Sequence, residues 1–312
     1  MATACAKVKT FMGINGPLFY YFLPVFLVLI GWEIRAARTR GLTLYTKTET
    51  LASIGIGVGQ RLIGLIPLSV TGFLSVVLYE QRLFDIPMHD WRSWLGLFVL
   101  LEFTYYWFHR ASHEVRWFWT THAVHHSLEE LNILGSYRLG WTGKFSLGYL
   151  FHLPLMGIGF SPEAVATMLA LNLFYQSWLH TILIGKLGVL EGVLNTPSAH
   201  RVHHAKNADY LDRNYGGVTV VFDRLFGTYQ AERAEEPCVF GLVKPVGSTN
   251  IFVVAFHEWG RMFADLRAHS IRHWPGFLFG PPGWRPNGAG LTAKEIRARY
   301  RAEAGAAAVP AE

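Results

Sequence analysis

Long apolar runs dominate the first two thirds of the chain. Residues 11–32, 62–79 and 164–185 contain no Asp, Glu, Lys or Arg. A helix that crosses the hydrocarbon core of a bilayer needs about 20 mainly apolar residues. The pattern therefore predicts an integral membrane protein built from α-helices, with its first span over about residues 15–33.

The second apolar segment, residues 51–79, is long for a single span and contains Arg61. It is either one tilted helix or a broken pair of helices. An arginine inside an apolar segment is a functional candidate, although a snorkelling side chain or a break in the helix explains it equally well. Residues 94–108 are again apolar and end where a histidine-rich sequence begins.

A helical hairpin is predicted over residues 145–160 and 163–181. Gly159, Ser161 and Pro162 separate the two apolar halves, and this combination is typical of a turn followed by a helix start.

The distribution of charge indicates how these segments are oriented. The positive-inside rule assigns the basic stretch 35–50 to the cytoplasm. If residues 51–79 cross once, every histidine cluster emerges on the cytoplasmic face, whereas a double crossing would separate the two basic regions. Residues 182–245 are too polar to span, and residues 248–266 suit an interfacial helix. The predicted fold class is an all-α integral membrane protein with four or five transmembrane helices and a cytoplasmic, histidine-rich helical cap.

Composition agrees with this interpretation. The chain is 51% hydrophobic and only 16% charged, against about 25% charged residues in ordinary soluble domains. A formal charge of +6 suits anionic lipid headgroups. No compact basic patch with interleaved aromatic residues indicates a nucleic-acid partner.

Nine of the 14 histidines lie in patterns that favour metal binding. Residues three or four positions apart share one face of a helix, so each cluster presents its imidazoles in one direction. Imidazole nitrogens suit iron, zinc or copper. The other five histidines, at positions 89, 152, 257, 269 and 273, are interpreted as packing residues. The nine candidates are His109, His113, His122, His125, His126, His180, His200, His203 and His204.

The ligand set and the missing motifs narrow the chemistry. Soluble di-iron bundles use glutamates and Glu-x-x-His pairs, which are absent here, as is the HExxH motif of zinc proteases. Neutral imidazoles leave the metal charge uncancelled, which favours oxidation of an unactivated C–H bond. Cys5 and Cys238 are too few for an iron–sulfur cluster, and the sequence GIGVGQ at 55–60 lacks the last glycine of a nucleotide fingerprint. Electrons must therefore come from outside the chain.

Three sequences in the order of the histidine clusters resemble the fatty acid hydroxylase and sterol desaturase superfamily of membrane di-iron enzymes. They are YYWFHRASHE at 105–114, WTTHAVHHSLEELN at 119–132, and the segment from AHRVHH to GTYQAE at 199–232. YQSWLHT at 175–181 and the NYGG sequence look most like the alkylglycerol monooxygenase branch. The resemblance implies one domain over 1–301. The remaining residues, AEAGAAAVPAE at 302–312, are expected to form a disordered tail.

The resemblance also implies two iron ions held by the nine histidines, with O₂ as co-substrate. Gln176 occupies a position where another branch has a tenth histidine, so the tenth imidazole is either missing or replaced by an amide. Glu129 follows the second cluster, where the branch also has a glutamate; it either lies near a pterin or is an exposed loop acid. The electron donor is a reductase protein or a reduced tetrahydropterin.

Three further polar residues have two interpretations each. Glu102 shares a helix face with His109 and His113, so it either supports a ligand or makes a polar contact between spans. Asn214 and Asp223 follow the third cluster. They either orient ligating imidazoles or, in the case of the Asn214-Tyr-Gly-Gly sequence, simply form a turn.

The leading hypothesis is an O₂-dependent di-iron monooxygenase that hydroxylates a membrane lipid, with its histidine site facing the cytoplasm from a bacterial inner membrane or the endoplasmic reticulum. A lipid desaturase would use the same metals. A non-oxidative zinc protein or metal transporter would instead place its ligands along a path through the membrane or beside a carboxylate base. The sequence gives no indication of oligomeric state.

Overall fold

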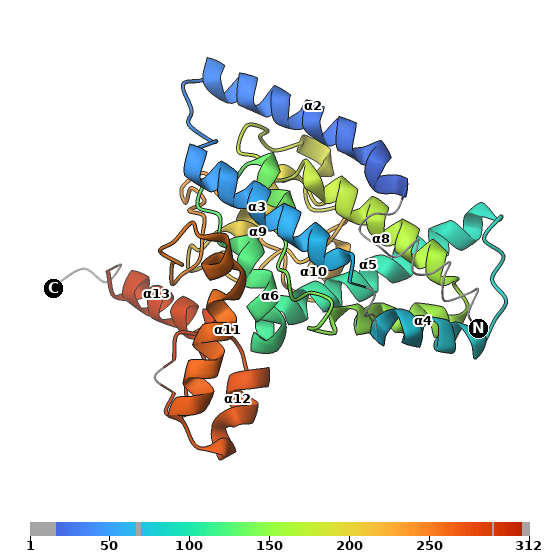
Figure 1. The fold of residues 1–312 in the computed structure, drawn as a ribbon. Coiled ribbons are helices and arrows are strands. Elements are labelled where there is room, and N and C mark those ends of the chain that lie inside the picture. The colour runs from blue at the N-terminus through green and yellow to red at the C-terminus, as the bar shows by residue number, and fades with distance from the viewer. Residues whose placement is uncertain (1–16, 67–69, 289, 308–312) are drawn as a thin grey trace.

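The computed structural model describes residues 17–66, 70–288 and 290–307, and within these ranges it contains helices and loops but no β-strand. This agrees with the all-α prediction (Figure 1). The helices are α2 (Pro17–Thr39), α3 (Lys47–Gly64), α4 (Val70–Glu80), α5 (Trp91–Glu114), α6 (Arg116–His126), α7 (Leu153–Ile158), α8 (Pro162–Ser177), α9 (Pro197–His204), α10 (Val221–Leu225), α11 (Ile251–Ala268), α12 (Trp274–Phe279) and α13 (Ala293–Ala307). Short 3₁₀ turns are η1 (Ile133–Tyr137), η2 (Gly148–His152), η3 (Gly188–Leu190) and η4 (Ile271–His273).

The apolar segment 51–79 forms two helices, which is the broken pair rather than one tilted span. α3 ends at Gly64 and α4 begins at Val70. Pro67 lies between them in the sequence and has no backbone N–H with which to continue a helix.

The hairpin turns where the sequence predicts it, but its first arm is short. Gly159 adopts a φ of 140°, which favours glycine. The Ser161 side chain then accepts a hydrogen bond from the Ala164 N–H, and Pro162 is the first residue of α8, as expected at a helix start. The arm before the turn comprises only η2 and α7, from Gly148 to Ile158.

Fewer helices than expected have the length and hydropathy of a membrane span. Among the described residues one qualifies, Tyr20–Thr39 within α2, while α4 and the segment Gly148–Ile158 are apolar but shorter. The described residues therefore do not contain the four or five continuous spans that the sequence predicts. The apolar sequence is divided into shorter helices, because helices end inside it.

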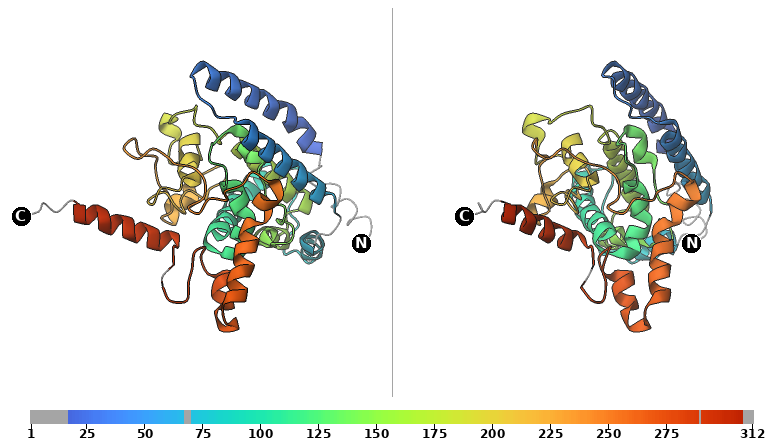
Figure 2. Two further views of the ribbon diagram at one scale, coloured as in Figure 1. Left: turned by 60° about the vertical axis from the view of Figure 1, so that its left-hand side comes forward. Right: turned by 90° about the vertical axis from the view of Figure 1, so that its left-hand side faces the viewer.

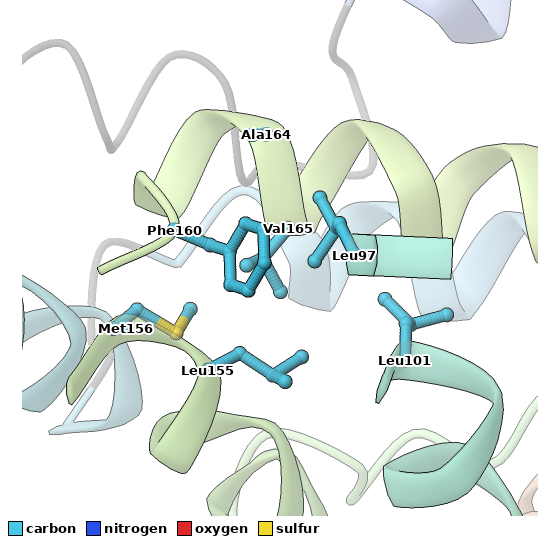
Figure 3. Packing of buried hydrophobic residues seen from close by; sticks show 7 residues of the cluster. All are labelled: Leu97, Leu101, Leu155, Met156, Phe160, Ala164 and Val165. Atoms are coloured by element: carbon cyan, nitrogen blue, oxygen red, sulfur yellow. The ribbon is translucent and has the colours of Figure 1, made fainter. Parts of the chain in front are cut away.

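A buried apolar cluster fixes the helices that lead to the histidines. Leu97 and Leu101 of α5 pack against Leu155 and Met156 of α7 and against Val165 of α8 (Figure 3). Burying each such side chain contributes about 1.5–3 kcal/mol, so the cluster holds α5 and α8 in a fixed relation.

The C-terminal helices lie at the edge of the molecule. α11 and α12 pack together, and α13 projects from the body (Figure 2). Residues 248–266 were expected to be helical and largely correspond to α11. α13 continues to Ala307, six residues into the predicted disordered tail, and residues 308–312 lie outside the described part of the chain.

Candidate metal centre

The first two histidine clusters lie on consecutive helices. α5 starts at the Asp90 cap, whose side chain accepts a hydrogen bond from the Arg92 N–H, and carries His109 and His113 in its last turns. Val115 has an extended backbone and separates α5 from α6. The chain therefore reverses, and α6 packs against α5 with its own three histidines near its end.

The third cluster occupies the short helix α9, in which every residue is buried. The Thr196 hydroxyl accepts a hydrogen bond from the Ala199 N–H, and Pro197 is the first helical residue. Both features favour a helix start at this point. His180 lies just beyond the C-terminus of α8, where its Nδ1 is 3.0 Å from the Gln176 carbonyl oxygen.

All nine candidate histidines come together, in two groups whose ring nitrogens lie within 4.8 Å of one another. α6 and α9 each contribute to both groups, because consecutive residues point about 100° apart around a helix, which separates His125 from His126 and His203 from His204. The other five histidines belong to neither group in the described part of the chain. The first group contains His109, His113, His122, His126 and His203, and the second contains His125, His180, His200 and His204.

Backbone carbonyls fix the protonation of three of these rings. His109 Nδ1 lies 2.8 Å from the Tyr215 carbonyl oxygen, and His203 Nδ1 lies 3.0 Å from that of Arg213. His180 is held in the same way by Gln176. A carbonyl only accepts, so each Nδ1 is the protonated nitrogen and each Nε2 carries a lone pair.

The Nε2 atoms converge as ligands of a metal ion do. His122 Nε2 lies 3.0 Å from that of His109 and 3.1 Å from that of His126. In the second group, His180 Nε2 lies 3.1 Å from those of both His125 and His200. Neighbouring nitrogens bound to one ion at about 2.1 Å have similar spacing. Lone pairs this close repel one another unless a cation lies between them.

Burial keeps the rings neutral. The Nε2 atoms of His113 and His203 are buried without a hydrogen-bond partner in the described residues. Burial also lowers the pKa values of His122, His126 and His204 well below the usual range. Since metals bind the neutral imidazole, the donor set fits two metal ions.

The motif after the third cluster supports the carbonyls that hold His109 and His203. The Asp223 carboxylate accepts hydrogen bonds from the Tyr215 and Gly216 N–H groups, each at 2.7 Å. Asn214 has a φ of 56° and donates to the Ala199 and Gln230 carbonyls. Both residues therefore shape a turn and, through its backbone, orient imidazoles. Burial raises the pKa of Asp223 to about 6 despite its hydrogen bonds, so the group is ionised at neutral pH.

Glu102 contacts loops rather than histidines. Its buried carboxylate accepts hydrogen bonds from the Val218 and Thr219 N–H groups and from the Asn172 amide. It thus links α5, α8 and the segment beside Asp223. Of the two interpretations that the sequence allowed for Glu102, this is the polar contact between helices.

The Gln176 side chain belongs to neither histidine group. Its amide donates to Asn172 Oδ1 at 2.6 Å and accepts from the Tyr105 hydroxyl at 3.2 Å. Gln176 instead contacts His180 through its backbone carbonyl, so the expected amide in place of a tenth histidine supports the centre indirectly.

Two other candidates lie outside the histidine groups, and one neighbour was missed. Glu129 is exposed and lies against Gly241. Arg61 lies in α3, where it donates to the Tyr137 hydroxyl at 2.6 Å. Asp212 was not predicted, yet its Oδ1 lies 3.4 Å from His113 Nδ1. The sequence signal that could have identified Asp212 is its position two residues before Asn214, in the segment after the third histidine cluster.

Fold and site together define a class of protein: over its described residues, an all-helical chain that gathers nine histidines, seven of them buried, in two groups, each able to hold a metal ion. Residues 94–228 match the model of the fatty acid hydroxylase family. The chain therefore resembles this family over the segment that carries all nine histidines.

The names of individual relatives describe enzymes that act on lipids. The chain is 34% identical to human alkylglycerol monooxygenase over 275 residues, which are 86% of this chain and 59% of that protein. It is 32% identical to an ornithine lipid hydroxylase of Rhizobium tropici over 43% of this chain and 40% of the relative. It is 30% identical to a sterol desaturase of Schizosaccharomyces pombe over 55% of this chain and 57% of the relative. No solved structure matches the chain.

Proposed function

We propose that this protein is an O₂-dependent di-iron monooxygenase that hydroxylates a C–H bond of a membrane lipid. The observation that carries the proposal is the convergence of Nε2 lone pairs in two histidine groups. The relatives supply the substrate class, since their names include alkylglycerol monooxygenase and a lipid hydroxylase. The chain spans only 59% of the human relative. We therefore propose a lipid as the class of substrate and no particular lipid.

Each part of the site has a role in this proposal. The nine histidines would hold two irons, which would supply the activation of O₂; one oxygen atom would be inserted into the C–H bond and the other released as water, which takes two electrons from an external donor and two protons. The Tyr215, Arg213 and Gln176 carbonyls keep three rings in the ligating tautomer. Burial excludes bulk water from this centre.

A membrane location supports access to such a substrate. α2 has the length and hydropathy of a span, and its C-terminal end carries Arg35, Arg38 and nearby Arg40. Arg40 donates to the Leu183 carbonyl oxygen, three residues after His180. The basic end of α2 therefore lies on the same side as the metal centre, which favours a cytoplasm-facing site. We propose that the shorter apolar helices complete the membrane-embedded part.

The electron donor is proposed to be either a reductase protein or a reduced pterin. Glu129 is exposed beside Gly241, so it is accessible to a dissolved donor. Cys238, the one described cysteine, is a free thiol.

Metal analysis, oxygen uptake and lipidomics test this function together. The purified protein is expected to contain about two irons per chain and to consume O₂ with lipid and reductant. Cells that contain it should accumulate a lipid with one added oxygen atom. One stable zinc without redox activity would overturn the proposal.

Desaturation is the second candidate, because one relative is named a sterol desaturase. The same lipidomic experiment separates the two reactions. A desaturated lipid loses two hydrogens and gains no oxygen.

A further inference from the structure

An apolar cavity of about 560 Å³ lies between α2, α3 and η1. The two helices run side by side at the edge of the molecule in the views of Figures 1 and 2. Leu27 and Ile30 of α2 face Ile54 and Val58 of α3 across the groove. Its volume lies within the range of small-molecule sites, roughly 300–1,000 Å³, and its walls suit a hydrocarbon chain.

One end of the groove carries a positive charge. Arg61 lines the cavity together with Tyr137, and its guanidinium lies 5.3 Å from the centre of the Tyr137 ring. Guanidinium groups bind phosphate through paired, charge-assisted hydrogen bonds. Tyr20 and Tyr21, at the same end of α2, are 66% and 74% exposed, as is typical of tyrosines at the headgroup level of a bilayer.

The other end of the groove approaches the metal centre. Tyr45 lines the cavity and donates to the buried Glu33 carboxylate. Glu33 also accepts a hydrogen bond from the Ile133 N–H at 2.8 Å, and the Thr181 side chain lies near the same carboxylate. Thr181 directly follows His180, a member of the second histidine group.

We propose that this groove binds a membrane phospholipid, with its phosphate at Arg61 and one acyl chain between α2 and α3. Charge complementarity at Arg61 and the apolar walls select this occupant over an uncharged lipid. Arg61 lies 14 residues after Lys47 on α3, about 21 Å along the helix. A chain anchored at Arg61 therefore extends toward Tyr45 and the centre. Binding of the phospholipid in the groove does not depend on the proposed function. The additional inference that this bound lipid is the substrate does rest on it.

Lipid binding to the purified, full-length protein tests the proposal without turnover. Native mass spectrometry, with O₂ and reductant excluded, would compare phosphatidylglycerol with diacylglycerol, which lacks the phosphate, and with a free fatty acid. Phosphatidylglycerol is expected to bind most tightly. Arg61→Gln should weaken its binding about tenfold or more, while Arg61→Lys should retain part of the affinity.

A second pair of variants tests the groove itself. Leu27→Trp places a large ring in the cavity and should reduce phosphatidylglycerol binding. Val28→Trp is the matched control, because Val28 is 70% exposed and does not line the groove. A phospholipid with a photoreactive group in its chain should cross-link to α2 and α3 in the wild type.

The outcomes separate this inference from the proposed function. Unchanged phosphatidylglycerol binding in both Arg61→Gln and Leu27→Trp would overturn the inference. Preference for the fatty acid or for diacylglycerol would also overturn it. Groove-dependent binding without any lipid oxidation would instead count against the monooxygenase alone.

Discussion

Helix α9 buries polar side chains, whereas helix α2 exposes apolar ones. Every residue of α9 is buried, including three histidines and Arg201, whereas α2 leaves Tyr21 and Val28 about three quarters exposed. Soluble proteins seldom bury charged groups that are not paired, and they rarely expose large apolar patches. The polar interior is therefore stabilised by specific partners, such as the ion pair of Arg201 with Glu232. The apolar exterior of α2 is consistent with contact to lipid.

The largest effects are expected at the nine histidines, which we propose hold the metal ions. His126→Ala removes a proposed ligand from the first group, and His204→Ala removes one from the second. Each variant should lose metal from its own group and lose oxidation by more than about 100-fold, because ligand loss exceeds the usual cost of losing a supporting contact. Metal content per chain and lipid oxidation measure both effects.

His257→Ala provides the control for these variants. His257 lies in α11, and its Nδ1 contacts the Val254 carbonyl oxygen at 2.7 Å, away from both groups. It should keep its metal and its activity. Full activity in both His126→Ala and His204→Ala would refute the assignment of the centre.

A smaller effect is expected where the surrounding loop supports the histidines. Asp223→Asn replaces one carboxylate oxygen by an NH₂ group that faces backbone N–H groups instead of accepting from them. The Tyr215 carbonyl should then hold His109 less firmly, and metal affinity should fall about 10- to 100-fold. Asp85→Asn, at a side chain that is 85% exposed, should leave the affinity unchanged. Equal affinities in the two variants would mean that the loop does not orient His109.

Glu102→Gln is expected to affect stability more than metal binding. Glu102 Oε2 accepts from the Val218 and Thr219 N–H groups, and Oε1 accepts from the Asn172 amide. Glutamine has one side-chain oxygen for these two places, so its NH₂ group must face at least one of these donors, and a buried unsatisfied donor costs about 1–3 kcal/mol. Thermal unfolding in detergent should show the loss, with Glu80→Gln on the exposed end of α4 as control. A fall in metal content at unchanged stability would indicate that Glu102 supports the ligands instead.

The sequence could predict which histidines form the centre, but it could not predict how they divide. Helical spacing placed His122, His125 and His126 on one face, and all three do point to the site. Their separation between two groups depends on how α6 and α9 approach each other. That approach is set by long-range packing, and no local pattern encodes it.

The carbonyl contacts of the histidines and the number of membrane spans also could not be predicted from the sequence. The Arg213 and Tyr215 carbonyls reach His203 and His109 because Asp212 and Asn214 adopt positive φ values of 53° and 56°. Asparagine and aspartate permit this conformation without requiring it. Within the described residues the apolar runs do contain helices, but run and helix differ in length, since α8 ends at Ser177 inside the run 164–185. Hydropathy alone does not show where a helix ends, as α3 does at Gly64.

The smallest effect is expected at Glu129, which is exposed at the edge of the buried centre. Surface substitutions usually change stability by less than about 0.5 kcal/mol, and Glu129 belongs to neither histidine group. Glu129→Gln should therefore keep its metal content and its unfolding temperature. If a reduced pterin binds there, the variant should need more pterin for half-maximal oxidation and should respond normally to a protein reductase. Loss of metal in this variant would mean that Glu129 supports the metal centre. The contrast between the buried histidines and the exposed surface around them would then not hold at this position.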